Sequence, residues 1–230
     1  MFKKIIFTGG VLVFILTVAI ILSSSTVMAA DNLETLLAED LEIPTQIEDL
    51  IAKFSEIDYQ TTIIENDTTT YEGINSYRYL GKEEIQGEST DKISFEIDPS
   101  GQEASFMIFW IADGQFKQAE IQGEIIPGQM LGMMGDNILN TVFAPFHNIS
   151  EYDLEELAKT GEVSSSQKLI GDKEVEVVTI TVKDIPEAEL ESGTVQIANL
   201  ENLLMVVAYN FVSGVEDFEA EFEVLNFELR

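Results

Sequence analysis

The sequence predicts an α+β protein with a single twisted antiparallel sheet of seven or more strands. We expect a half-open barrel, with N-terminal helices and a central helical plug on its concave face. Three observations support this: a helical pattern near the start, runs of alternating apolar and polar residues separated by short turns, and one Met-rich helical segment between them. Because strands follow strands, the helical crossovers of a parallel sheet are not expected.

The first thirty residues have the composition of a cleaved signal peptide. Lys3 and Lys4 precede the apolar stretch Ile5–Leu22, and Val27–Ala30 offers small residues for cleavage. The alternative is an uncleaved anchor, since eighteen apolar residues can just span a bilayer. The densest apolar run, Val11–Leu22, is shorter than such a span and therefore favours cleavage. We therefore expect a signal over 1–30, one domain over 31–230 and no stable membrane anchor. The protein would be periplasmic, cell-wall associated or extracellular.

Charge excludes two classes of partner. Outside the first thirty residues the chain carries 42 acidic and 10 basic residues, a formal charge of −32. Nucleic acid and anionic lipid surfaces both require a basic footprint, so neither is expected as a partner. The chain is nevertheless 45% hydrophobic, which is typical of a folded domain, and it has no cysteine and hence no disulfide framework.

The segment Asp31–Ile57 is predicted to be helical. Asp31 suits an N-cap, and Pro44 suits the first turn of a second helix. Apolar residues recur at helical spacing on both sides of this proline: Leu33, Leu36, Leu37, Leu41, Ile47, Leu50, Ile51 and Phe54. We expect two short helices or one kinked helix before the sheet begins.

A meander of four to six strands follows. Its predicted strands are Tyr59–Glu65, Tyr71–Leu80, Lys82–Gln86, Lys92–Ile97, Ala104–Ala112 and Gln115–Gly123. Asp98–Gly101 and Asp113-Gly114 carry turn signals between strands. In Gln115–Gly123 the spacing of the apolar residues implies a bulge or a change of register.

The segment Pro127–Lys159 predicts the helical plug, and it contains a cluster of methionines. Methionine is flexible and polarizable, so a surface rich in it suits ligands of variable shape. Ordinary core packing is the alternative for the same residues. The apolar positions of the segment that we assign to the site are Met130, Met133, Met134, Ile138 and Phe143.

The chain then returns to strands. They are predicted at Val163–Ile170, Lys173–Val182, Val195–Ala198, Leu203–Phe211 and Phe218–Leu229, with an acidic loop or helical turn over Pro186–Ser192. Over Phe218–Val224 in the last strand, apolar residues alternate with glutamates, which predicts one buried and one acidic face. The alternation shifts at Leu225–Phe227, which predicts a bulge.

No motif for catalysis is present. The sequence lacks a cysteine nucleophile, a Gly-x-Ser-x-Gly elbow, a P-loop, a dinucleotide fingerprint and an EF-hand. His147 is the single histidine, and one histidine does not make a zinc site. We expect no enzyme, no cofactor and no metal, with loose calcium binding near Asp184–Glu191 left open.

The layout resembles the LolA/LppX-type lipoprotein-carrier superfamily. The resemblance runs from an export signal through the helix ending at Ile51–Ser55 to strands, a helical plug and the final segments Asn199–Leu204 and Phe222–Phe227. It implies a half-closed antiparallel barrel that holds acyl chains beneath its helices. By this likeness Phe106, Ile108 and Trp110 would line the cavity from the sheet. The chain departs from the family in its extreme charge, and it has neither a lipidation cysteine nor a sign of a lipoprotein partner.

The resemblance and the methionine cluster together predict an exported, non-enzymatic carrier or binding protein for a lipid or other apolar ligand. The ligand would lie between the sheet and the Met-rich helix. The alternative is a cell-surface or secreted structural or interaction protein with a filled core and an acidic surface. The sequence leaves the oligomeric state open.

Overall fold

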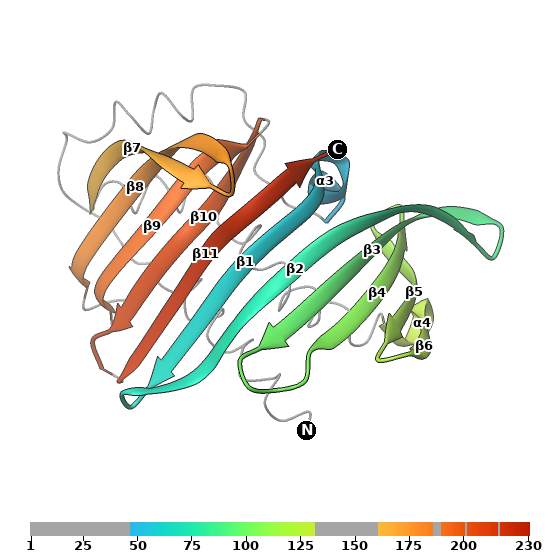
Figure 1. Ribbon diagram of the computed structural model, residues 1–230, viewed down its shortest axis with the longest axis horizontal. Helices are drawn as coiled ribbons and strands as arrows, with labels where there is room; N and C mark the ends of the chain where they lie inside the picture. Colours follow the sequence, from blue (N-terminus) through green and yellow to red (C-terminus); the bar gives the residue numbers. More distant parts are fainter. Residues whose placement is uncertain (1–46, 132–160, 186–189, 201, 216) are drawn as a thin grey trace.

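The computed structural model describes residues 47–131, 161–185, 190–200, 202–215 and 217–230 (Figure 1). Within them lies an antiparallel sheet of eleven strands, in the order β6-β5-β4-β3-β2-β1-β11-β10-β9-β8-β7. The sheet does not close, because β6 and β7 form its two edges. The prediction of one large antiparallel sheet is confirmed. The predicted signal, the helix over 31–46 and most of the predicted plug lie outside the described residues.

The first meander runs outward from the centre of the sheet. Its strands are β1 (Phe54–Glu65), β2 (Thr68–Ile85), β3 (Glu88–Pro99), β4 (Ser105–Ala112), β5 (Gln115–Ile121) and β6 (Glu124–Pro127). Asn66 and Asp67 both have positive φ, as do Asp113 and Gly114, and such turns match the twist of the strands that they join. The sequence did not predict β6; its final Pro127 lies on an edge strand, where a missing N–H is tolerated.

The second meander runs inward and ends beside the first. Its strands are β7 (Glu162–Ile170), β8 (Lys173–Ile185), β9 (Leu190–Leu200), β10 (Leu203–Ser213) and β11 (Phe218–Leu229). β11 pairs with β1 along its whole length, from Phe54 opposite Leu229 to Glu65 opposite Phe218. The predicted bulge is confirmed, since Tyr59 pairs with Val224 while Asp58 pairs with Asn226.

Two short helices are described. In α3 (Ile47–Lys53) the side chains of Ile47, Leu50 and Ile51 are buried, and Arg230 Nη1 donates a hydrogen bond of 2.6 Å to the Ile51 carbonyl. The predicted continuation of this helix to Ile57 is wrong, because Phe54 already pairs with β11. The described part of the plug is α4 (Gly128–Leu131), which buries Leu131. None of the described helices has the length and apolarity needed to cross a membrane.

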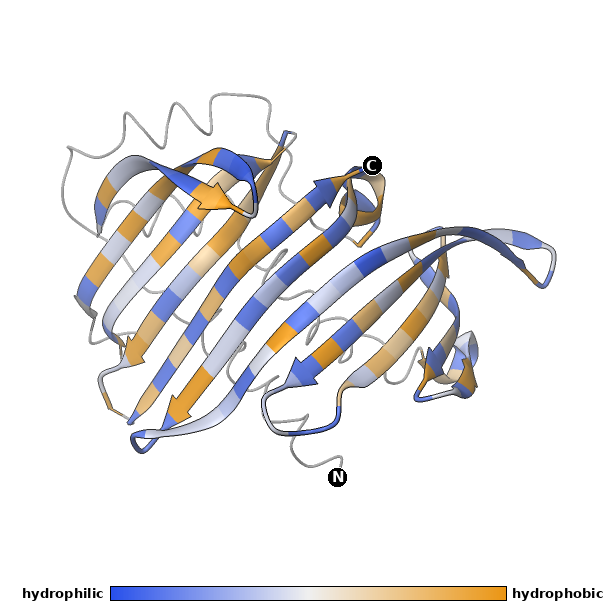
Figure 2. Cartoon of the chain, viewed as in Figure 1, coloured by the Kyte–Doolittle hydropathy of each residue, from blue (hydrophilic) through white to orange (hydrophobic). Residues whose placement is uncertain are grey.

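The aromatic residues most deeply buried in the first meander share one face. Tyr77, Phe95 and Phe109 are at most 1% exposed, and we call the face that they share the core face. The side chains between them, including Arg78, Ser94 and Glu96, lie on the opposite side, which we call the outer face. The bands of alternating hydropathy along β1, β2 and β3 in Figure 2 reflect this arrangement.

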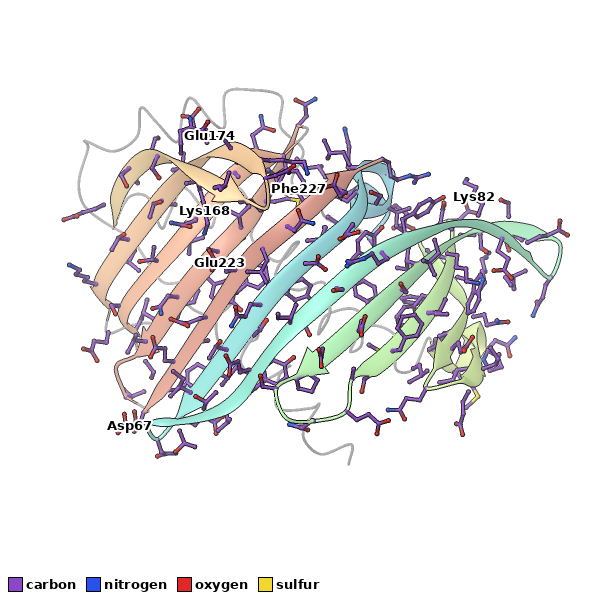
Figure 3. All side chains as sticks on the ribbon, viewed as in Figure 1. Asp67, Lys82, Lys168, Glu174, Glu223 and Phe227 are labelled. Atoms are coloured by element: carbon purple, nitrogen blue, oxygen red, sulfur yellow. The ribbon has the colours of Figure 1, made fainter. Side chains whose placement is uncertain are left out.

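The strands of the second meander bury both faces. Val177 and Val178 follow one another in β8 and are 0% and 2% exposed. β7 crosses in front of β8, β9 and β10 in Figure 1 and so covers part of the outer face. Lys168 Nζ lies 2.9 Å from Glu223 Oε1 on β11 (Figure 3), which fixes the curled strand in place.

Candidate functional site

Aromatic rings cover the centre of the core face. One row crosses β5, β4, β3 and β2, with centroid separations of 5.3, 6.1 and 5.5 Å between successive rings of Phe116, Phe109, Phe95 and Tyr77. A second row crosses β1, β11 and β10, with separations of 5.5, 5.2 and 5.3 Å between Tyr59, Phe222, Tyr209 and Phe211. Such a surface is apolar and rigid, which suits contact with apolar ligands.

Four polar side chains interrupt this apolar surface where β10, β11, β1 and β2 run side by side. We call Tyr59, Tyr71, Asn75 and Tyr209 the hydroxyl cluster. Tyr59 lies opposite Asn75 in the β1–β2 pairing, and the Tyr71 hydroxyl donates a hydrogen bond of 3.2 Å to Asn75 Oδ1. Tyr209 stacks on Phe222, which itself packs against Tyr59. Strands from both meanders therefore contribute to the cluster.

Gly73 allows the Tyr71 ring to lie along β2 and reach Asn75. A Cβ atom at position 73 would lie 2.7 Å from the Tyr71 hydroxyl oxygen, a separation too short for any other residue at that position without movement of the ring. The glycine thus orients one member of the cluster.

Two members of the hydroxyl cluster have unused hydrogen-bonding capacity. Asn75 is 6% exposed, and within the described residues its amide nitrogen makes no hydrogen bond; the same holds for the Tyr209 hydroxyl. Buried donors of this kind are normally paired, so a water or a ligand atom is a suitable partner for both groups.

The tyrosines of the cluster are neutral. Burial raises the pKa of Tyr59 far above its ordinary value, and the nearby Tyr71 and Tyr209 hydroxyls raise it further. Burial alone raises the pKa of Tyr209. For Tyr71 burial also raises the pKa, although the hydrogen bond to Asn75 partly opposes this. Each hydroxyl therefore keeps its proton at any physiological pH and remains a hydrogen-bond donor.

The cluster offers hydrogen bonds without a positive charge. Among the described residues, the one charged group that shifts the pKa of a cluster tyrosine is Asp98, a carboxylate that acts on Tyr71. Arg230 lies over the ring of Tyr79, and Arg78 pairs with Glu56 and Asp58 on the outer face. The described residues also include no group of three or more His, Cys, Asp or Glu that could hold a metal ion.

The structure places the three predicted sheet residues on the outer face. In β4 the core-face residues are Met107, Phe109 and Ile111, so Phe106, Ile108 and Trp110 alternate to the other side. Phe106 is 47% exposed and pairs with Glu96. Their contact with a ligand stays a prediction, but they do not lie on the face that the prediction assumed.

Trp110 is buried although it lies on the outer face. Its indole N–H donates a hydrogen bond of 3.1 Å to Glu83 Oε2, and Lys92 Nζ lies 4.8 Å from the ring centroid. The same carboxylate pairs with Lys92 at 2.8 Å, and the hydrogen bonds from Lys92 and then Trp110 lower the pKa of Glu83. These contacts give Trp110 a structural role in the sheet.

The methionine prediction is only partly within the described residues. Met130 lies in α4 and is 60% exposed, while Met133, Met134, Ile138 and Phe143 fall in 132–160. The hydroxyl cluster was not predicted from the sequence. A signal was present in β2, where Tyr71, Asn75 and Tyr77 have the period-two spacing of one sheet face.

Comparison with known proteins gives low-identity similarities. No protein-family model and no curated protein matches the sequence. MucB of Pseudomonas aeruginosa, solved with MucA, is 11% identical with a TM-score of 0.35; the match covers 87% of this chain and 56% of that one, so the chain spans about half of MucB.

Two further solved structures have similar layouts. A LolA superfamily protein from Nitrosomonas europaea is 9% identical over 89% of this chain and 94% of its own, with a TM-score of 0.29. A DUF1329 family protein from Desulfovibrio piger is 9% identical over 79% and 88%, with a TM-score of 0.23. A LolA superfamily protein is therefore among the solved structures to which this chain is similar. What this chain binds has to be argued from its own residues.

Proposed function

We propose that this chain is an exported, non-enzymatic binding protein that holds an apolar ligand against the core face, over the hydroxyl cluster. The observation that carries the proposal is the Asn75 amide nitrogen, which belongs to a side chain only 6% exposed and has no hydrogen-bond partner among the described residues. A completely filled core would leave this group unsatisfied, at a cost of about 1–3 kcal/mol. A ligand or water beside it removes that cost.

The surroundings of this group favour a ligand with a large apolar part. Apolar and aromatic side chains surround Asn75, with Tyr59 opposite on β1, Ile97 opposite on β3 and Tyr77 two residues along β2. Ligand pockets commonly combine mostly apolar walls with a few converging polar groups. The predicted export signal and the lack of a nucleophile motif support the exported, non-enzymatic part of the proposal.

The proposal changes which sheet residues we expect to contact the ligand. Ile97 and Phe222 on the core face replace Phe106, Ile108 and Trp110, which lie on the outer face. Contact with Met133 and Met134 remains part of the proposal, as the sequence predicts.

Extraction and a binding assay test the proposal together. We expect organic extraction of the purified protein, followed by mass spectrometry, to release a lipid-like compound, and we expect the protein to bind a fluorescent probe carrying an acyl chain. Ile97→Trp should fill the space beside Asn75 and weaken probe binding. Ile74→Trp is the matched control, because Ile74 lies on the outer face of the neighbouring strand and is 50% exposed.

The alternative predicts the opposite results. A structural or interaction protein with a filled core would release no lipid and bind no acyl probe, and Ile97→Trp would then destabilise the fold through overpacking by about 1–3 kcal/mol.

A further inference from the structure

We infer that the ligand is an amphiphile whose head group is uncharged and accepts hydrogen bonds, such as an ester or an alcohol, and that the hydroxyl cluster binds this head group. The inference rests on the proposed function and names the class of ligand for the same site. It follows from what the cluster can donate and from the charges that it lacks.

The hydrogen-bonding groups that remain for a ligand in the cluster are donors. The Asn75 carbonyl oxygen already accepts from Tyr71, so the part of this side chain left to bind a ligand is the N–H₂ donor. Tyr209 adds a hydroxyl that makes no hydrogen bond to the described residues and keeps its proton. A ligand atom that satisfies the Asn75 amide must therefore be an acceptor, which excludes an ammonium group from this position.

The surroundings of the cluster disfavour a negatively charged head group. A carboxylate or phosphate would accept from the same donors, but it would lose its hydration beside aromatic rings with no lysine or arginine in the described part of the cluster to compensate. Asp98 near Tyr71 and the net charge of −30 add repulsion. An uncharged carbonyl or hydroxyl oxygen receives the same hydrogen bonds without these penalties.

The donors of the cluster also favour an amphiphile over a plain hydrocarbon. A hydrocarbon would occupy the aromatic surface but would displace water from Asn75 and Tyr209 without replacing its hydrogen bonds. A buried donor left unpaired in this way weakens binding by roughly ten-fold or more. The cluster thus selects for one oxygen-bearing head group at a defined place on the sheet.

Three ligands with the same chain length test the inference. We would measure how methyl palmitate, palmitate and hexadecane displace a fluorescent acyl-ester probe from the purified protein at neutral pH. The expected result is that methyl palmitate binds at least ten-fold more tightly than either of the others. Palmitate binding most tightly, or all three binding equally, would overturn the inference.

Variants that each remove one hydrogen-bond donor show which residues cause the preference for the ester. Tyr209→Phe and Asn75→Leu should each reduce the preference for the ester over hexadecane to a few-fold, with hexadecane binding unchanged or tighter. Tyr79→Phe is the control, because its hydroxyl lies on the core face outside the cluster and donates to Asp91 at 2.9 Å. An ester preference that survives both cluster variants would also overturn the inference.

The same experiment separates the two proposals. If none of the three ligands binds, and circular dichroism shows the sheet intact, the proposed function fails and the inference fails with it. If the ligands bind without discrimination, the proposed function stands and only the assignment of the head group is overturned.

Discussion

β2 in the first meander buries a single face, whereas β8, β9 and β10 in the second bury both. In β2 the core-face residues Asn75 and Tyr77 are 6% and 0% exposed, while Ile74 on the outer face is 50% exposed. In β9 Ile197 and Ala198 are adjacent and are 1% and 0% exposed. One continuous sheet therefore contains a region that is buried on both faces and a region that is buried on one face.

The difference comes from what covers the outer face. At the second meander β7 curls back, and its Ile170 is 1% exposed. The Lys173 ammonium group donates a hydrogen bond of 2.7 Å to the Phe227 carbonyl and so joins the β7–β8 turn to β11. Strands with cover on both faces are apolar without alternation, and strands with one covered face alternate. The pattern of a strand thus reports how many of its faces are covered.

The largest effect should come from a charge placed on the covered outer face. Val177→Glu puts a carboxylate at a position that is 0% exposed, so we expect destabilisation by about 3–5 kcal/mol in chemical denaturation. Ile74→Glu makes a similar change on the uncovered outer face of β2, where the side chain is 50% exposed, and should alter stability by about 0.5 kcal/mol or less. Equal effects of the two changes would show that β7 does not shield the outer face.

Alkaline pH should weaken the centre of the sheet, where the two meanders meet. Burial raises the pKa of Tyr59, Tyr77 and Tyr209 above the ordinary value of 10.0. Because the folded protein holds these protons more tightly, its stability is complete below pH 10 and falls as the pH rises further. The loss should be about 1.4 kcal/mol per pH unit for each tyrosine.

Absorbance titration near 295 nm measures this effect. These three hydroxyls should ionise only when the sheet unfolds, as followed by circular dichroism. Ionisation of all tyrosines near pH 10 in a protein that remains folded would contradict the burial of the central rings.

A smaller effect should follow loss of the ion pair that fixes β7. Lys168→Met removes a partly buried pair with Glu223, so we expect a loss of about 1 kcal/mol and faster amide hydrogen exchange in β7 and β8. Lys82→Met is the control, since Lys82 is 64% exposed and lies 4.0 Å from Asp91. Unchanged exchange in β7 would show that apolar contacts alone keep it curled.

The smallest effect should be that of salt. The chain carries 42 acidic and 12 basic residues, and β11 carries Glu219, Glu221 and Glu223 on its outer face, the last two of them exposed. Screening over about 10 Å at 0.1 M salt reduces their repulsion, so the melting temperature should rise by a few degrees from low to moderate salt. Glu221→Gln should reduce this dependence slightly. A melting temperature independent of salt would show that local ion pairs, such as that of Lys168 with Glu223, already compensate the charges.

Local patterns predicted most strands correctly, because turn signals such as Asp113-Gly114 and alternation such as that of Phe218–Val224 act over a few residues. The face of β4 was different. Both of its sides are apolar, so alternation alone did not decide between Phe106 and Met107. The register does, because Met107 lies opposite Phe95 in β3 and Phe95 belongs to a strand with clear alternation.

The hydroxyl cluster was beyond prediction from local patterns for a related reason. Tyr71 and Asn75 lie on one strand, and their spacing places them on one face. Tyr209 joins them only because β11 pairs with both β1 and β10, and this pairing connects residues far apart in the sequence. No short-range pattern encodes such a contact, so only the folded arrangement reveals it.

The pairing of β1 with β11 also sets an order of folding. Phe54 begins the first described strand and its partner Leu229 ends the last, so the central pair of the sheet forms only after both meanders have been synthesised. Until then the first meander has an unpaired strand at its inner edge, and contacts between such distant residues form slowly. The hydroxyl cluster is complete only when β1 and β11 pair, because its residues come from both meanders.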